Sequence, residues 1–293
     1  MTGNDTLRCQ QTIANPVRLD GFGYWNGLDV LLEFKPAPAN SGIVIIRPDL
    51  PDCPRMVAHV SHRVDMSLRT VLDNGTIRVE MIEHLMAAFA GLQIDNCEVW
   101  IDRAEMPGLD GSSKMFVEVL QSAGIKKQIA EREKLIVSRT MKVGDENSWI
   151  QAEPSDGEFS LDYELDFPDC PAIGNQKLQI ELNRDSFCNG LANARTFILE
   201  SQAKLLREKG LCERVTYGDV LVFGDQGVID NDLRYPDECV RHKSLDFVGD
   251  FALAPFDIVG KFTSYRSGHQ LHAEMLKRLL QEGHFVSANR SVA

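Results

Sequence analysis

The first half of the chain shows the apolar patterns of several β-strands. Val30 to Phe34 has the composition of a strand, and Ile43 to Ile46 is a continuous apolar run typical of a buried strand. Prolines and the turn residues Asn40-Ser41-Gly42 separate these two segments. From Cys97 to Ile101, the residues alternate with the period of two that a strand requires. The pattern therefore predicts strands at all three places.

A helical period interrupts the strands between Glu80 and Leu92. Five apolar residues in this segment recur at the spacing of one helix face: Met81, Leu85, Ala88, Phe89 and Leu92. Gly91 and Asn96 are residue types that suit the exit from a helix. We therefore expect a helix over residues 80–92 that ends near Gly91.

The second half mixes strand-like and helix-like segments in the same way. The patterns predict strands over residues 161–167, 177–182 and 220–223, and helices over residues 201–209, 237–253 and 272–281. The helix over 237–253 is expected to be amphipathic. This mixture predicts an α+β protein in which each half packs helices on a sheet. The charged segment Lys126 to Lys134 separates the halves, so we expect two domains, at residues 1–128 and 134–293.

Composition narrows the range of partners. The 293 residues include 31 Lys and Arg against 43 Asp and Glu, which gives a formal net charge of −12. This acidity disfavours binding to nucleic-acid phosphates or to an anionic membrane surface. No segment approaches the ~18 apolar residues of a membrane span, and Met1 to Asn15 lacks the apolar stretch of a signal peptide. The seven cysteines form no C-x-x-C motif, so we expect reduced thiols and a cytoplasmic protein.

Two short segments combine residue types that bind metals. His242 and Asp246 are four residues apart on a predicted helix, so their side chains share one face and can reach one ion. Two imidazoles and a carboxylate form a three-ligand set of the kind found in catalytic zinc sites. His84 is the best candidate for the third ligand. Its neighbour Glu83 would then lie close enough to take a proton from metal-activated water.

Each of these features also has a simpler explanation. A histidine and an aspartate four residues apart are typical of an ion pair on a helix surface. A lone Glu-His pair in apolar sequence is typical of a buried histidine whose hydrogen bonds are satisfied. The spacing alone therefore suggests a metal site without establishing one.

A series of longer motifs resembles the UDP-3-O-acyl-N-acetylglucosamine deacetylase family of lipid A synthesis, over residues from roughly Gln11 to Leu280. In the first half the matching segments are Gln10 to Ile13, Pro36 to Gly42, Arg47 to Leu50, Glu83 to Leu92 with Ile94-Asp95-Asn96, and Leu109 to Ser113. In the second half they are Ala194 to Phe197, Arg241 to Lys243, Leu245-Asp246, Gly249-Asp250 and Ser267-Gly268-His269. The chain has no G-x-S-x-G or Walker-type loop that would indicate another mechanism.

The resemblance implies a metal-dependent hydrolase that removes the N-acetyl group from UDP-3-O-acyl-N-acetylglucosamine. The ligands of a catalytic Zn²⁺ would be His84, His242 and Asp246, a set that also suits Fe²⁺. Glu83 would be the general base, and His269 would stabilise the oxyanion and protonate the leaving amine. Asp250 would hold His269 in its working orientation. The family fold implies small inserts that flank an active site between the two domains.

Further matches imply contacts with the substrate. Thr196 would donate a hydrogen bond to the developing oxyanion. Lys243 would contact the polar part of the substrate, and Phe197 would pack against the sugar. Asp110 belongs to a loop that is important in the family, although an ordinary turn residue in an Asp-Gly pair is the alternative explanation.

Four segments depart from the family pattern: Tyr24 to Gly27, Gly108 to Gly111, Glu213 to Val215, and residues 220–232. None contains a proposed metal ligand, base or acid, so they leave open the acyl length and the exact nucleotide sugar. Two alternatives follow, namely a related deacetylase acting on another N-acetylated sugar and a non-catalytic binding protein of the same fold. We expect a monomer that binds an acylated UDP-amino-sugar and no nucleic acid.

Overall fold

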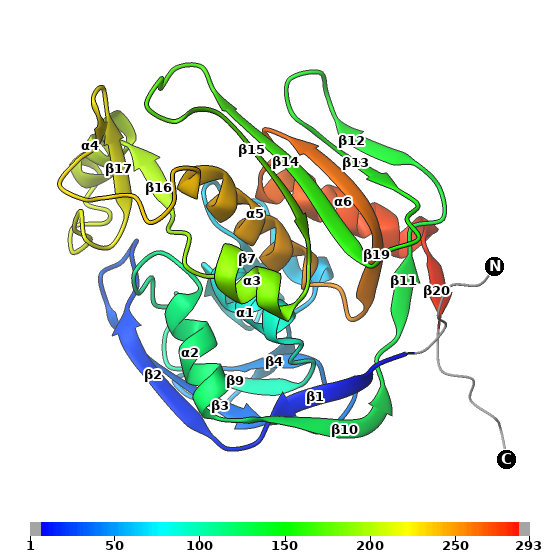
Figure 1. Ribbon diagram of the computed structural model, residues 1–293. Coiled ribbons are helices and arrows are strands. Elements are labelled where there is room, and N and C mark those ends of the chain that lie inside the picture. The colour runs from blue at the N-terminus through cyan, green and yellow to red at the C-terminus, as the bar shows by residue number, and fades with distance from the viewer. Residues whose placement is uncertain (1–6, 287–293) are drawn as a thin grey trace, which may run out of the picture.

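The structure, a computed structural model, describes residues 7–286 as two large sheets with helices between them (Figure 1). The first sheet has five strands in the spatial order β2 (Val17–Phe22), β3 (Asp29–Pro36), β9 (Cys97–Ile101), β4 (Ile43–Ile46) and β5 (Arg55–Val57). Helices α1 (Glu83–Leu92) and α2 (Lys114–Ser122) lie on its inner side, where the rings of Phe34 and Phe89 meet edge to face.

The second sheet has seven strands around the long strand β19 (Asp257–Tyr265). The other six are β11 (Lys134–Ile136), β12 (Met141–Gly144), β13 (Trp149–Glu153), β14 (Phe159–Phe167), β15 (Gly174–Glu181) and β20 (His284–Val286). Helices α5 (Glu238–Phe251) and α6 (His269–Glu282) pack on this sheet, and α1 packs against α5 and α3 (Arg184–Gly190). The layers therefore run sheet, helix, helix, sheet, and the α+β prediction is confirmed.

Two small inserts accompany the large sheets. The first contains η1 (Val60–His62), β6 (Arg63–Val64), β7 (Val71–Asp73) and β8 (Arg78–Glu80). The second contains β16 (Phe197–Leu199), α4 (Glu200–Glu208), β17 (Leu221–Gly224) and β18 (Gly227–Val228). A separate two-stranded sheet pairs β1 (Cys9–Ile13) antiparallel with β10 (Ile125–Glu131). The charged segment that separates the halves is thus largely a strand.

The predicted strands and the helix over residues 201–209 are confirmed to within three residues at each end. The helices predicted over residues 80–92, 237–253 and 272–281 are confirmed within the same limit. Helix α1 begins at Glu83 rather than Glu80, because Met81 has the left-handed φ of 58°. Helix α6 begins at His269 rather than His272, and β20 follows it. Within residues 7–286, no helix combines the length and apolar character needed to span a membrane.

Helix α1 ends at Leu92 as predicted, but Gly91 is not the residue that ends it. It lies inside the helix, and a Cβ atom there would come within 2.0 Å of the Phe187 ring on α3. Gln93, with φ of 58°, takes the left-handed position that ends the helix. The glycine therefore serves close packing between helices.

Helix α5 is not amphipathic, contrary to expectation. All of its residues except Arg241 and Lys243 are buried. The reason is its position, since α1 covers one side and the second sheet and α6 cover the others. Its polar residues must therefore find partners inside the protein.

Candidate active site

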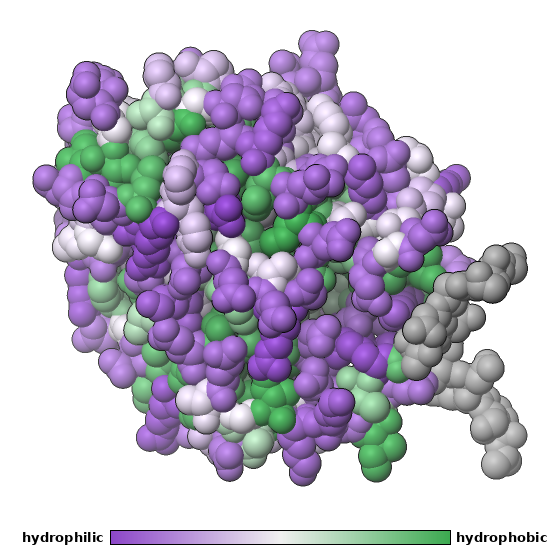
Figure 2. Space-filling view, viewed as in Figure 1, coloured by the Kyte–Doolittle hydropathy of each residue, from purple (hydrophilic) through white to green (hydrophobic). Residues whose placement is uncertain are grey.

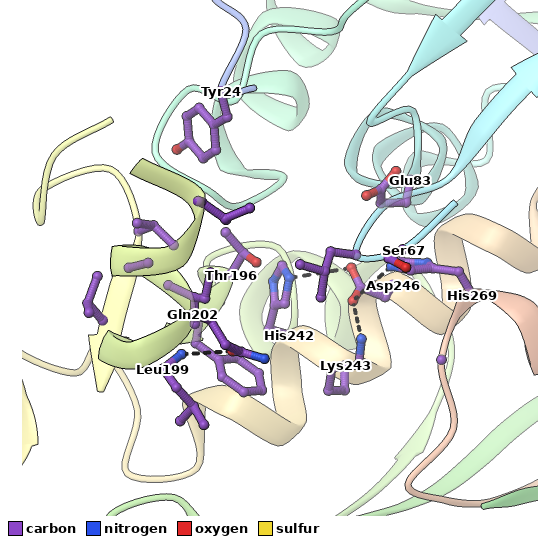
Figure 3. Close-up of a pocket in the computed structure, with 18 of the residues that line it drawn as sticks. Tyr24, Ser67, Glu83, Thr196, Leu199, Gln202, His242, Lys243, Asp246 and His269 are labelled. Carbon is purple, nitrogen blue, oxygen red and sulfur yellow. Dashed lines mark hydrogen bonds and ion pairs between the residues drawn. The ribbon is translucent and has the colours of Figure 1, made fainter. Parts of the chain in front are cut away.

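Three side chains with metal-ligand atoms converge where α1 crosses α5. His84 lies on the first turn of α1. His242 and Asp246 lie one turn apart on α5 (Figure 3). The Nε2 atoms of His84 and His242 are 3.6 and 3.4 Å from Oδ1 of Asp246. The three ligand atoms lie within 4.8 Å of one another, and all three residues are buried. The structure therefore brings together the three residues that the sequence suggested.

The surrounding hydrogen bonds leave these ligand atoms free. Nδ1 of His242 lies 3.1 Å from the carbonyl oxygen of Ala194, a contact that assigns the proton to Nδ1 and the lone pair to Nε2. Lys243 Nζ donates to Oδ2 of Asp246 at 2.7 Å. Oδ1 of Asp246 is buried and has no hydrogen-bond partner among the described residues. Such an atom is costly unless a cation satisfies it, so the residues fit a divalent metal ion.

Burial and neighbouring charges set the protonation of these ligands. Burial lowers the pKa of His242 to about 4, so this imidazole is neutral near pH 7. Burial alone would raise the pKa of Asp246, but nearby His242 and Lys243 hold it well below its usual range. Burial acts to lower the pKa of His84, yet contact with Asp246 outweighs it and raises the pKa. An ion must therefore compete with a proton for His84.

Glu83 lies beside the first ligand, at the start of α1. Only 3% of its surface is exposed, and Oε2 accepts a hydrogen bond from the Thr70 backbone N–H at 3.0 Å. Burial raises the pKa of the Glu83 carboxyl, which makes the carboxylate a better proton acceptor than a solvent-exposed glutamate. Glu83 and His84 both line the same cavity.

His269 lies beside Asp246 of the ligand set, at the first position of α6. Its Nε2 atom is 4.0 Å from Oδ2 of Asp246, and its Nδ1 atom is 2.7 Å from Oδ2 of Asp250. Burial acts to lower the pKa of His269, but the Asp250 carboxylate outweighs it and raises the pKa to about 9. The imidazole is therefore a cation near pH 7 and can donate a proton.

Eight of the predicted site residues line this cavity, and Asp250 and Asp110 do not. Asp250 lies behind His269, as the sequence implied. Asp110 also lies behind the cavity wall. One oxygen of Asp110 accepts hydrogen bonds from Ser112, and the other pairs with Arg234 at 2.8 Å. The structure thus gives Asp110 partners within the protein.

Thr196 and Phe197 reach the cavity from the second insert. The Thr196 N–H donates to the carbonyl of Gly111 at 2.7 Å, and Gly111 has the left-handed φ of 77°. A Cβ atom on Gly111 would lie 2.7 Å from a backbone oxygen and 3.0 Å from the Thr196 methyl, so glycine is required there. The Phe197 ring stands edge-on to the His242 ring at 6.4 Å.

A buried ion pair holds the segment that joins these residues to α5. Glu238 accepts hydrogen bonds from the Arg195 backbone and side chain at 3.0 and 2.8 Å. Arg195 lies between Ala194, whose carbonyl oxygen faces His242, and Thr196. Because Glu238 is one turn before His242 on α5, this pair fixes the segment relative to the metal ligands.

Sequence reasoning missed two residues of the site, Thr70 and His272, and one contact of the predicted residue Lys243. Thr70 donates to Oδ1 of Asp250 through its hydroxyl and to Glu83 through its N–H. Lys243, expected only at the substrate, also bonds a metal ligand. His272 places Nδ1 2.7 Å from Asp250. Only Lys243 carried a sequence signal, its position three residues before Asp246.

The cavity beside the ligand set has a volume of about 920 Å³. Figure 2 shows apolar side chains gathered over the α4, β16 and β17 region, where one wall of the cavity lies. Apolar residues of both inserts and of β14 line it, among them Leu68, Leu165, Ile198, Leu199, Leu206 and Val222. The cavity can therefore bury a long apolar group next to the polar site.

The segments that depart from the family pattern meet at one rim of this cavity. The Tyr24 hydroxyl lies 3.0 and 2.7 Å from the carbonyl oxygens of Leu109 and Asp219. Arg214 donates to the carbonyl of Gly27 at 3.0 Å. Five residues of the departing segments line the cavity itself: Tyr24, Trp25, Val215, Val220 and Val222. Differences that are scattered along the sequence thus act together in space.

Comparison with known proteins agrees with this site. A family model described as UDP-3-O-acyl N-acetylglycosamine deacetylase matches residues 10–281. The UDP-3-O-acyl-N-acetylglucosamine deacetylases of Brucella ovis and Brucella canis are each 40% identical to the chain over 275 residues. Each match covers 93% of this chain and 96% of the relative. With residues 10–281 matched in this way, the chain belongs to the family of UDP-3-O-acyl N-acetylglycosamine deacetylases.

Proposed function

We propose that this chain removes the N-acetyl group from UDP-3-O-acyl-N-acetylglucosamine, as its relatives are named to do, in lipid A biosynthesis. The supporting observation is that the ligand set is accompanied by a buried carboxylate, Glu83, and a half-buried cation, His269, that line the same cavity. Amide hydrolysis requires a proton acceptor for water and a proton donor for the amine, and this arrangement supplies both. We expect the enzyme to work in the cytoplasm as a monomer.

His84, His242 and Asp246 would hold the metal ion on which the family depends. We propose Zn²⁺, because two imidazoles and one carboxylate form a catalytic zinc set, while Fe²⁺ also suits these ligands. When bound, the ion supplies a Lewis acid beside the scissile carbonyl and the attacking water.

The remaining steps belong to residues of the chain. Glu83 takes a proton from the attacking water as its oxygen bonds to the amide carbon. The Thr196 hydroxyl and His269 donate hydrogen bonds to the carbonyl oxygen as it gains negative charge. The carbon–nitrogen bond then breaks, and His269, oriented by Asp250, gives its proton to the departing amine. The products are acetate and a free amino sugar.

The cavity would bind the rest of the substrate. Its apolar wall would bury the acyl chain, and Phe197 would pack against the sugar. Lys243 lines the same cavity and adds positive charge suited to a phosphorylated ligand. We propose that Asp110 acts indirectly, because its loop places the Gly111 carbonyl on the Thr196 N–H.

The test measures kcat/KM for acetate release from the acylated UDP sugar and from UDP-N-acetylglucosamine. We expect a strong preference for the acylated form, because each buried CH₂ group of the acyl chain contributes up to ~0.8 kcal/mol of binding free energy. Equal or better turnover of the bare sugar would favour a deacetylase for another sugar. Tyr24 and Trp25, which line the cavity, would then adapt its shape to that sugar. Metal-loaded protein without turnover on any sugar would favour a binding protein.

A further inference from the structure

The Asp250 carboxylate accepts hydrogen bonds from two imidazoles, and the proposed reaction uses only one of them. Nδ1 of His269 and Nδ1 of His272 each lie 2.7 Å from Oδ2 of Asp250. The Thr70 hydroxyl donates to the other oxygen. His269 faces the cavity, whereas His272 is fully buried and does not line it. His272 therefore cannot touch the substrate, but it contacts the residue that orients the proton donor.

The environment of His272 defines which of its nitrogens carries the proton. Nε2 lies 2.9 Å from the Ser267 hydroxyl, which in turn lies 2.6 Å from the Ser264 hydroxyl. Tyr163 anchors this turn by donating to the Ser267 carbonyl at 2.6 Å. Because the Ser267 hydroxyl can donate to Nε2, a neutral His272 keeps its proton on Nδ1 and donates it to Asp250.

His269, His272 and Asp250 also form a group whose ligand atoms lie within 4.8 Å of one another. The contacts favour hydrogen bonds over a second metal ion. Oδ2 of Asp250 is already at hydrogen-bond distance from both Nδ1 atoms, and Thr70 occupies Oδ1. Both oxygens of Asp250 thus have hydrogen-bond partners, unlike Oδ1 of Asp246.

Both histidines lie on α6, one turn apart, so they approach Asp250 from a single rigid element. A carboxylate held by one imidazole and a hydroxyl can still rotate about its side-chain bonds. A second imidazole on the same oxygen removes that freedom and fixes the direction in which His269 points. Catalytic groups must be held close to their productive geometry, and small displacements are costly in rate.

We propose that His272 is a positioning residue for the deacetylase reaction: its Nδ1 proton fixes the Asp250 carboxylate that orients His269. The inference rests on the proposed function, in which His269 protonates the leaving amine. It adds a residue that the metal, the base and the substrate never contact. Partners of this indirect kind around metal sites typically contribute 10–100-fold to activity or metal affinity.

The test compares His272→Leu with His272→Asn in the full-length, metal-loaded enzyme. Leucine fills the space without a donor, whereas the asparagine amide can place a donor near the position of Nδ1. We expect His272→Leu to lower kcat by about 10–100-fold with little change in KM, and His272→Asn to recover most of the loss. Metal content should stay at one ion per chain in both variants. Leu276→Val, which loosens α6 packing without touching the network, should keep its kcat.

A second arm separates positioning from packing. In the His269→Ala background, His272→Leu should have no further effect on the residual kcat, because the group that it orients is absent. Three results would overturn the inference: normal kcat in His272→Leu, failure of asparagine to rescue at equal Tm, or two ions per chain in the wild type and one in His272→Leu. A wild-type enzyme that releases no acetate would instead overturn the proposed function.

Discussion

The two carboxylate oxygens of Asp246 have different neighbours. Oδ2 accepts a hydrogen bond from Lys243 at 2.7 Å, while Oδ1 faces the Nε2 atoms of His84 and His242 without a hydrogen bond. Because the Lys243 ammonium group occupies Oδ2, only Oδ1 of Asp246 is left to bind an ion. At the scale of single residues, the site is specified by which atom of each side chain is occupied and which is left free.

Glu83→Gln should keep the metal and lose most turnover. The amide has nearly the same shape as the carboxylate but cannot accept a proton from water, so kcat should fall by ~10²–10⁴-fold. Steady-state kinetics with metal analysis on the same sample checks this. Glu118→Gln, an exposed change on α2, is the matched control and should behave as wild type. Unchanged turnover in Glu83→Gln would exclude the base role.

The protonation of His269 predicts the alkaline limb of the pH profile. Because Asp250 raises the pKa of His269 to about 9, its protonated form dominates at neutral pH and is lost as pH rises through that value. A bound cation adds positive charge nearby, which moves the limb to lower pH. Asp250→Asn removes the stabilising charge, so kcat should fall and the limb should move lower still. A limb that stays in place in Asp250→Asn would contradict the assignment of His269 as the acid.

At the scale of elements, the crossing of α1 and α5 determines the geometry of the site. Gly249 lies between Asp246 and Asp250 on α5, and a Cβ atom there would come within 2.0 Å of the Glu83 carbonyl oxygen. The two backbones therefore touch because one side chain is absent. Since α1 carries His84 and α5 carries two ligands, the spacing of the helices sets the spacing of the ligands.

Gly249→Ala should therefore disturb catalysis without altering any functional group. The added methyl group must push the helices apart, and a shift of about 1 Å in catalytic groups can cost 10²-fold in rate. We expect weaker metal binding and a similar loss of kcat, measured by metal titration and kinetics. Gly157→Ala, where the nearest atom is the Ser155 hydroxyl at 3.6 Å, is the control. Normal metal affinity in Gly249→Ala would show that the crossing tolerates displacement.

The element scale also shows what the sequence could and could not predict. Local spacing was sufficient to predict the strands and to place His242 and Asp246 on one helix face. Both predictions need only the hydrophobic period or the i, i+4 spacing within one segment. Local spacing could not show that α5 is buried on all sides, because its covering elements come from both halves of the chain. Thr70 was missed for the same reason, since it meets Asp250 from 180 residues away.

At the scale of the whole molecule, the site is shared by two halves. Residues 17–101 form the first large sheet and residues 134–286 the second. We propose that the domain boundary lies in residues 129–133, between these halves. Arg8 also joins them, because it pairs with Asp95 in the first half and with Asp257 in the second at 2.7 and 2.6 Å. The halves are thus linked by this ionic cluster as well as by the helix crossing.

Removing the metal should abolish activity and lower the Tm. An ion that binds only the folded state stabilises it by about 2.7 kcal/mol when its free concentration is 100 times Kd. Chelation should reverse this effect, and added Zn²⁺ should restore both Tm and acetate release. Thermal unfolding of the wild type and of His84→Ala, His242→Ala and Asp246→Ala checks this. Ligand variants that still bind one ion tightly would show that the ligand set is wrong.

The proposed metal ligands come from both halves of the chain, so they are synthesised at different times. His84 leaves the ribosome well before His242 and Asp246, and a nascent chain at that point holds one ligand of the three. The proposed set exists only after α5 has been synthesised and docked against α1. Uptake of an ion by this set would therefore report that α5 has been synthesised and docked against α1.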